Sequence, residues 1–106
     1  MTFQMVRKIA LALPNVADGT SYGSPALKFR GKLIVRWRED LDSIVLRTDF
    51  EAREEMMAAE PETYYITDHY RDYPWVLVRL SKVNRSVLGD LLKRACRCYR
   101  SGSSSE

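Results

Sequence analysis

Residues 32–38 read Lys-Leu-Ile-Val-Arg-Trp-Arg, in which side chains alternate along the chain with a period near two. This period is typical of a β-strand with one apolar and one polar face. A turn-forming stretch follows at 39–42, and a second strand-like run returns at 43–47. Two such runs around a short turn predict an antiparallel hairpin. The apolar side of the hairpin needs a cover, and in a small domain helices provide it.

Both ends of the chain carry helical patterns. A first helix is expected at residues 2–13 and ends at Pro14. Its apolar face comprises Val6, Ile9, Ala10 and Leu13. A last helix is expected after Asn84, whose side chain suits an N-cap. Its apolar stripe comprises Val87, Leu88, Leu91, Leu92, Ala95 and Tyr99.

Between these helices, the glycines and prolines of residues 14–31 indicate a loop with short extended pieces. A second helix is expected after Thr48 or Asp49 and before Pro61, and further strands at 64–67 and 75–80. The order of elements predicts one α+β domain at residues 1–100. It is a two-layer fold, an antiparallel β-sheet with the N- and C-terminal helices packed on one face and a short helix in the middle.

Two consequences of this fold can be stated for single residues. Val78 and Leu91 are expected to be buried in the interface between the sheet and the last helix. Residues 101–106, which are mostly serine, are expected to form a disordered tail.

The chain has 106 residues, with one His and two Cys. We expect no membrane span, because it lacks an apolar run of about 18 residues. The apolar run 9–13 is shorter than the h-region of a secretory signal, which favours a cytoplasmic location with reduced cysteines. On a helix Cys96 and Cys98 point apart, with Cys98 near the apolar stripe and Cys96 at its edge. We therefore expect no disulfide, metal site or cofactor.

Several short motifs occur in a fixed order. They are LALP at 11–14, GTSYGSP at 19–25, VLRTD at 45–49 with Arg53-Glu54, and ITDHY at 66–70 leading to YPWV at 73–76. In this order and spacing the chain resembles the MmcQ/YjbR family from about residue 5 to residue 100. The resemblance implies a frataxin-like (CyaY-like) fold and the family's usual description as DNA-binding. It implies no catalytic residues.

Three features bear on chemistry. Residues 19–23 match the G-x-S-x-G nucleophile elbow, but a helix precedes them and a strand follows, so we interpret them as a glycine turn. His69 lies between Asp68 and Asp72, where hydrogen bonding or packing in the turn is favoured over a role as general base. The frataxin-like resemblance also raises iron binding through carboxylates of the first helix, but that helix has no carboxylate, so iron binding is disfavoured.

Charge is unevenly distributed along the chain, although the net charge is only +3. Residues 26–38 carry five basic side chains and no acid, and residues 79–100 carry seven against Asp90. Residues 49–62 carry six acids against Arg53. A molecule with opposed basic and acidic sides can orient toward a polyanion.

Strand alternation predicts where these charges lie. It puts Leu33, Val35 and Trp37 on one side of their strand, and Lys32, Ile34, Arg36 and Arg38 on the other. With both helices on the apolar side, an open sheet face is expected to offer arginines for phosphates and an aromatic ring for stacking. The candidate nucleic-acid-binding residues on this face are Lys32, Arg36, Arg38, Arg47, Arg79 and Trp75.

These observations predict a small, monomeric, non-enzymatic module that binds DNA weakly and without sequence preference, and that has no membrane partner. Three alternatives stay open. The arginines are a solvated sheet face whose partners are the acids of the second helix. The domain binds a small ligand or a protein in an aromatic pocket near the loops, lined by Tyr22, Trp37, Tyr70, Tyr73 and Trp75. The domain is an enzyme that uses His69.

Overall fold

The computed structural model describes the backbone of residues 1–104 and the side chains of residues 1–99. In chain order the elements are α1 (Phe3–Leu11), β1 (Val16–Ser21), β2 (Ser24–Phe29), β3 (Lys32–Arg38), the 3₁₀ turn η1 (Glu39–Leu41), β4 (Ser43–Arg47), α2 (Phe50–Ala59), β5 (Tyr64–Tyr65), the 3₁₀ turn η2 (Asp68–Tyr70), β6 (Trp75–Arg79) and α3 (Arg85–Ser104). The predicted tail, residues 101–106, begins as the end of α3, and residues 105–106 lie outside the described residues. None of the helices in this part of the chain has the length and apolarity needed to cross a membrane.

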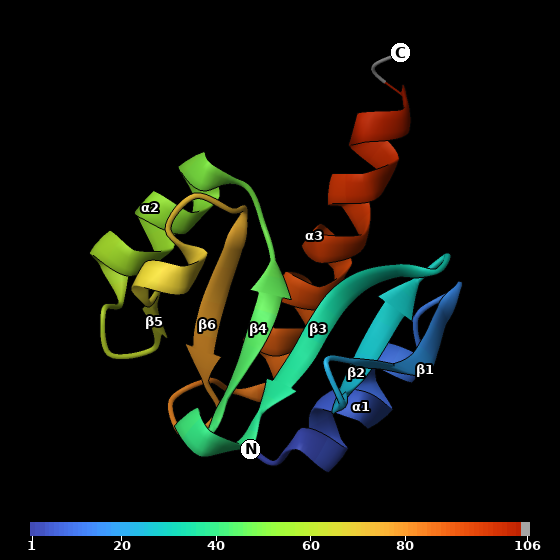
Figure 1. The fold of residues 1–106 in the computed structure, drawn as a ribbon, viewed down its shortest axis with the longest axis horizontal. Helices are drawn as coiled ribbons and strands as arrows, with labels where there is room; N and C mark the ends of the chain where they lie inside the picture. Colours follow the sequence, from blue (N-terminus) through green and yellow to red (C-terminus); the bar gives the residue numbers. More distant parts are fainter. Residues whose placement is uncertain (105–106) are drawn as a thin grey trace.

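The strands form one antiparallel sheet in the order β1-β2-β3-β4-β6-β5. Figure 1 shows α1 and α3 behind this sheet and α2 beside the edge that β5 and β6 form. The predicted class is confirmed: a two-layer α+β domain with both terminal helices on one face and a short helix between them.

Residues 16–29 form full strands, which the sequence indicated only as extended pieces in a loop. β1 and β2 pair along their whole length and are joined by Tyr22-Gly23, whose φ angles are 51° and 77°. Arg30-Gly31 joins β2 to β3 in the same way, with φ angles of 51° and 83°. Positive φ at both central residues is typical of the type I′ hairpin turn, and glycine adopts it without a steric cost. The chain breakers therefore mark tight turns.

Side chains cap the start of each α-helix. Thr2 accepts a hydrogen bond from the amide of Met5 at the start of α1. Asp49, one of the two residues expected to cap α2, accepts from the amide of Ala52 at 2.8 Å. Asn84 caps α3 as predicted, because its side-chain oxygen accepts from the amide of Val87 at 2.9 Å. These oxygens satisfy amides that have no partner within the helix.

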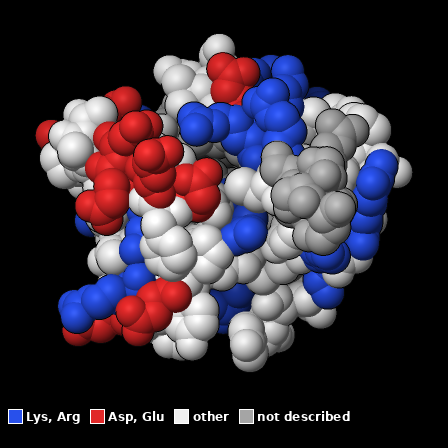
Figure 2. Space-filling model, turned by 90° about the horizontal axis from the view of Figure 1, so that it is seen from above, with Lys and Arg blue, Asp and Glu red and all other residues white. Residues whose placement is uncertain are grey.

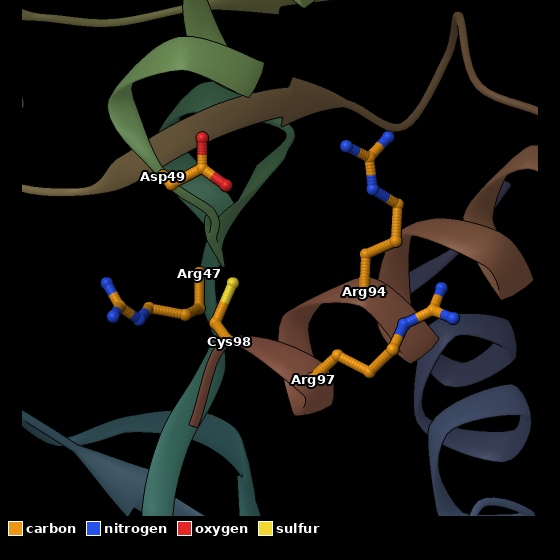
Figure 3. Close-up of a pocket in the computed structure, with 5 residues that line it drawn as sticks. All are labelled: Arg47, Asp49, Arg94, Arg97 and Cys98. Atoms are coloured by element: carbon orange, nitrogen blue, oxygen red, sulfur yellow. The ribbon is translucent and has the colours of Figure 1, made fainter. Parts of the chain in front are cut away.

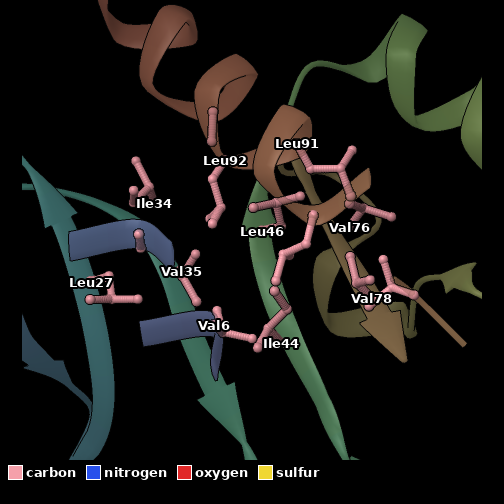
Figure 4. Close-up of a cluster of buried hydrophobic side chains, with 14 of the residues drawn as sticks. Val6, Leu27, Ile34, Val35, Ile44, Leu46, Val76, Val78, Leu91 and Leu92 are labelled. Atoms are coloured by element: carbon pink, nitrogen blue, oxygen red, sulfur yellow. The ribbon is translucent and has the colours of Figure 1, made fainter. Parts of the chain in front are cut away.

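Apolar side chains from both layers fill the space between the sheet and the helices (Figure 4). Fully buried members include Val6, Leu27, Ile34, Val35, Ile44, Leu46, Val76, Val78, Leu88 and Leu92. Val78 and Leu91 are 0% and 7% exposed, which confirms that both lie in this interface. Val87, predicted to belong to the apolar stripe of α3, is instead 38% exposed, since it lies in the first turn at the flank of the row formed by Leu88 and Leu92.

The alternation of β3 is interrupted at Ile34. Leu33 pairs with Lys28 and Val35 pairs with Leu27, so Ile34 is an extra residue without a cross-strand partner. This arrangement is a β-bulge, and it reverses the alternation on one side of the extra residue. The predicted sides are therefore right for residues 35–38 and wrong for residues 32–34.

Both cysteines are free, and Cys96 is buried while Cys98 is half-buried. Cys96 follows Leu88 and Leu92 at four-residue spacing, which places it inside the apolar stripe. The expectation that Cys98 lies nearer the stripe than Cys96 is wrong.

Candidate ligand site on the sheet face

The sheet face away from α1 and α3 presents rows of residues set by strand register. Arg36 pairs with Val45, which pairs with Leu77 on β6. One row further on, Arg38 pairs with Ser43, and Ser43 pairs with Arg79. Paired residues of antiparallel strands share a face, so arginines and apolar residues alternate across this face.

This face was expected to be open, and the structure corrects that expectation. Residues 66–75 fold over it, in front of the sheet in Figure 1, and bring Tyr70 against Val45 and Leu77. All three side chains are at most 6% exposed. Removing valine and leucine side chains from water stabilises the fold, and the ring of Tyr70 provides the cover.

A buried arginine holds this cover in place. Arg53 of α2 is 4% exposed and donates hydrogen bonds of 2.7–3.1 Å to the main-chain carbonyl oxygens of Tyr70, Arg71, Tyr73 and Trp75. These acceptors are neutral dipoles, which replace the water that the guanidinium group loses on burial. The sequence gives no sign of this role, because the acceptors are carbonyl groups 17–22 residues away.

Two of the candidate arginines meet at the hydroxyl of Tyr70. Arg38 donates to it at 2.9 Å and Arg36 at 3.5 Å. Arg38 also forms two hydrogen bonds with the carboxylate of Asp40, which hold the pKa of that carboxyl below its ordinary value. Arg36 donates to the carbonyl oxygen of Ser21 and lies 5.3 Å from the ring centre of Tyr22. Both guanidinium groups are therefore held in place.

The other candidates lie elsewhere. Arg79 is on the same face but at its far end, where it donates to the main-chain oxygen of Glu62 and stacks 4.0 Å from the ring centre of Tyr65. The Arg47 guanidinium and the Lys32 ammonium lie 5.0 and 5.4 Å from the ring centre of Tyr99 on α3. Lys32 is there because of the bulge. Arg47 ends β4, so its side chain can turn toward the helix layer.

The described side chains do not show the alternative in which these arginines pair with the acids of α2. Arg38 pairs with Asp40 in the turn after its own strand. Arg79 reaches Glu62 through a main-chain oxygen, and Arg47 donates to the main-chain oxygen of Thr48. The six candidates thus do not form one continuous basic surface.

A cavity with a volume near 510 Å³ opens between the sheet face and its cover. Its lining comprises Ser21, Tyr22, Leu33, Arg36, Val45, His69, Tyr70, Tyr73 and Trp75. Four of the five residues predicted for an aromatic pocket are in this lining. The fifth, Trp37, stacks on Phe3 in the helix layer with ring centres 5.3 Å apart.

The rings of this cavity come from two turns and one strand. Tyr22 stands at the tip of the β1–β2 turn and is 91% exposed, and Tyr73 is 56% exposed. Tyr70 is buried, and the ring of His69 meets it edge-on with centres 4.8 Å apart. Leu33 and Val45 form the apolar part of the cavity wall. The lining joins flat rings to one cation, Arg36, and includes no carboxylate.

Two further sequence features can now be placed in the fold. Gly19, Thr20 and Ser21 end strand β1, so the expected glycine turn is confirmed only at Tyr22-Gly23. Strand β2 follows the turn, where a nucleophile elbow needs a helix. In the described part of the chain, no three His, Cys, Asp or Glu side chains gather where they would hold a metal ion.

The geometry defines a class of protein: a small α+β domain with an aromatic, cationic cavity on its sheet face. The YjbR family model matches residues 11–98, most of the chain, and the chain therefore belongs to the YjbR family. This confirms the resemblance found in the sequence. No curated protein and no solved structure matches the chain.

Proposed function

We propose that this domain is a non-enzymatic binding module that takes an unpaired base of a single-stranded nucleic acid into the sheet-face cavity. The observation that carries the proposal is the composition of the lining, which combines flat rings with the Arg36 guanidinium and contains no carboxylate. Stacking of a base on an aromatic side chain contributes about 1–3 kcal/mol and tolerates any sequence. Arg36 supplies the positive charge for an adjacent phosphate.

The cavity favours single strands over duplexes. Bases in a duplex are already stacked on each other, so only an unpaired base can enter between Tyr22, Tyr73 and Trp75. A duplex would instead need a continuous basic surface, and Arg38, Arg47 and Arg79 are dispersed and partnered. We expect weak, sequence-tolerant binding, with a dissociation constant on the order of 10–100 µM. We propose that the domain acts as a monomer in the cytoplasm.

A second candidate is a free planar anion, for example a mononucleotide or an aromatic carboxylate. The cavity volume near 510 Å³ favours it, because small-molecule sites usually occupy about 300–1,000 Å³. The apolar wall made by Leu33 and Val45 suits the ring, and Arg36 suits the charged group. The two candidates share one chemistry, a flat ring beside an anionic group.

Quenching of tryptophan fluorescence tests both candidates. Trp37 packs on Phe3 outside the cavity, so the Trp37→Phe variant leaves Trp75 as a reporter inside it. This variant is titrated with a single-stranded 12-mer, the same sequence as a duplex, and mononucleotides at 50 mM salt. We expect the single strand to quench with at least about 10-fold higher affinity than the duplex, as loss of a stacked base predicts.

The three ligands in this titration distinguish the nucleic-acid candidate from the free-ligand candidate. Quenching by mononucleotides with no gain from a longer strand supports the free-ligand candidate and overturns the nucleic-acid candidate. Equal affinity for duplex and single strand also contradicts base insertion. No quenching by any ligand at 1 mM overturns both.

A further inference from the structure

A second hollow lies on the other side of the sheet, where the end of β4 and the start of α2 meet α3. It has a volume near 400 Å³ and is lined by Arg47, Asp49, Arg94, Arg97 and Cys98. Figure 3 shows Asp49 beside the start of α2, Arg94, Arg97 and Cys98 on α3, and Arg47 at the end of β4 with its side chain pointing away from Arg94 and Arg97. None of these residues lines the sheet-face cavity.

Helix and strand positions explain why positive charge gathers here. Arg94 and Arg97 are three residues apart, so they share one side of α3. Arg47 approaches from β4, held by its hydrogen bond to the Thr48 carbonyl oxygen and by the ring of Tyr99. Seen from above in Figure 2, Lys and Arg gather on the α3 side, whereas Asp and Glu gather over α2.

The charges of the hollow are not balanced within it. Its lining carries three arginines and one carboxylate, and the Asp49 carboxylate already accepts the capping hydrogen bond from Ala52. The ion pairs and hydrogen bonds among the described residues leave Arg94 and Arg97 without an acceptor. The Nε of Arg47 is buried and also lacks a hydrogen-bond acceptor. These unused donors favour an anionic ligand.

We propose that this hollow binds a phosphate group, held by Arg94 and Arg97, whose exposed side chains turn inward to contact it, with Arg47 as a fixed positive charge on the β4 side. The planar guanidinium groups match the oxygens of a phosphate in paired hydrogen bonds. The Asp49 carboxylate repels an anion, so the phosphate lies on the α3 side of the hollow, which Cys98 also lines. The phosphate is either the terminal group of a monoester or a diester of a nucleic-acid backbone.

Cys98 provides a local measure of occupancy. Its thiol lines the hollow, and burial raises its pKa although Arg47 and Arg94 act in the opposite direction. A bound phosphate blocks access to the sulfur and disfavours the thiolate, so it slows alkylation. The Cys96→Ser variant removes the second thiol, which is buried in the core.

The experiment measures the iodoacetamide rate of Cys98 in the Cys96→Ser variant, with inorganic phosphate or chloride at equal ionic strength. We expect phosphate to slow alkylation about 5-fold or more, with half of the effect at millimolar concentration. Adding Arg94→Gln and Arg97→Gln abolishes this phosphate effect. Lys93→Gln is the matched control, because it removes a positive charge from the same helix but lies outside this lining; its phosphate effect stays. Circular dichroism verifies the fold of each variant.

Two ring-free compounds identify the source of the phosphate. Glycerol 3-phosphate is a monoester, and dimethyl phosphate is a diester. Protection by the monoester alone assigns the hollow to terminal phosphates, and protection by both assigns it to backbone phosphates as well. The proposal is overturned if 50 mM phosphate leaves the rate unchanged, or if Lys93→Gln abolishes the effect as the double substitution does. Neither result depends on Trp75 quenching, so the proposals for this hollow and for the sheet-face cavity are tested independently.

Discussion

Arg53 donates a hydrogen bond of 2.7 Å to the main-chain carbonyl oxygen of Tyr73, a residue 20 positions further along the chain. This contact joins α2 to the segment that covers the sheet face. The same guanidinium group binds three further carbonyl oxygens. The wall of the sheet-face cavity therefore depends on a side chain that does not line it.

Replacing Arg53 is expected to destabilise the domain strongly. Arg53→Ala leaves several carbonyl groups without their donor, and we expect the free energy of unfolding to fall by about 2–4 kcal/mol. Arg71→Ala is the control, since Arg71 is exposed in the same segment, and it should change stability by less than about 0.5 kcal/mol. Urea unfolding measures both, and equal effects would contradict the role assigned to Arg53.

Leu91 should contribute to stability through burial between α3 and the sheet. Leu91→Ala is expected to cost about 2–5 kcal/mol, because it removes buried methyl groups and leaves a cavity. Val87→Ala, at an exposed position on the same helix, should cost under about 0.5 kcal/mol. A loss below about 1 kcal/mol for Leu91→Ala in thermal or urea unfolding would show that this side chain is not part of the core.

The hydroxyl of Tyr70 has a role separate from that of its ring. Tyr70→Phe keeps the ring over Val45 and Leu77 but removes the acceptor for Arg38 and Arg36. We expect a loss of about 1–2 kcal/mol, as hydrogen bonds to charged groups predict. Tyr73→Phe provides the comparison. The Tyr73 side chain is 56% exposed, so the free energy of unfolding of this variant should be unchanged. Equal unfolding midpoints for the two variants would refute this role.

Salt dependence tests the proposed place of Arg36 beside a phosphate. Arg36→Gln should weaken single-strand binding and make the slope of log affinity against log salt less negative by about 0.7, which corresponds to one lost phosphate contact. Arg79→Gln should leave the slope unchanged, because Arg79 lies at the far end of the face against Tyr65. Fluorescence titrations at 50–200 mM salt measure both slopes, and a larger change for Arg79→Gln would place the nucleic acid elsewhere.

The pH profile of Cys98 alkylation should reflect its surroundings. Burial disfavours the thiolate and raises the pKa of Cys98, while Arg47 partly opposes this effect. In the Cys96→Ser variant the rate should therefore reach half of its maximum at a pH above the ordinary thiol value, and unfolding in urea should return it to that value. Arg47→Gln should move the midpoint higher still. A midpoint at or below the ordinary value contradicts the assigned environment.

Periodicity was sufficient to predict the two layers and the positions of the terminal helices, since the buried faces of α1, α3 and the central strands follow simple spacings. It did not predict β1 as a strand, because Val16-Ala-Asp-Gly-Thr-Ser has no apolar alternation and is held by pairing with β2. The bulge at Ile34 was also hidden, because an extra residue in a strand depends on the register with its neighbour.

The candidate site was only partly predictable for a related reason. Strand alternation correctly placed Arg36, Arg38, Arg79 and Trp75 on one face, and the aromatic content of the turns indicated a pocket. The cover over that face depends on Arg53 and on carbonyl groups remote from it, which leave no local pattern. Without that cover, the arginines looked like one open basic surface.

Tyr22 stands almost fully exposed on a two-residue turn, and it lines the cavity without belonging to the core. Substitutions at Tyr22 therefore alter the cavity while leaving the buried layers intact. The turn is a natural place to engineer ligand preference. A library at position 22 can be screened for new specificity if Gly23 is kept and β-branched residues are left out, because position 22 itself has a φ of 51°.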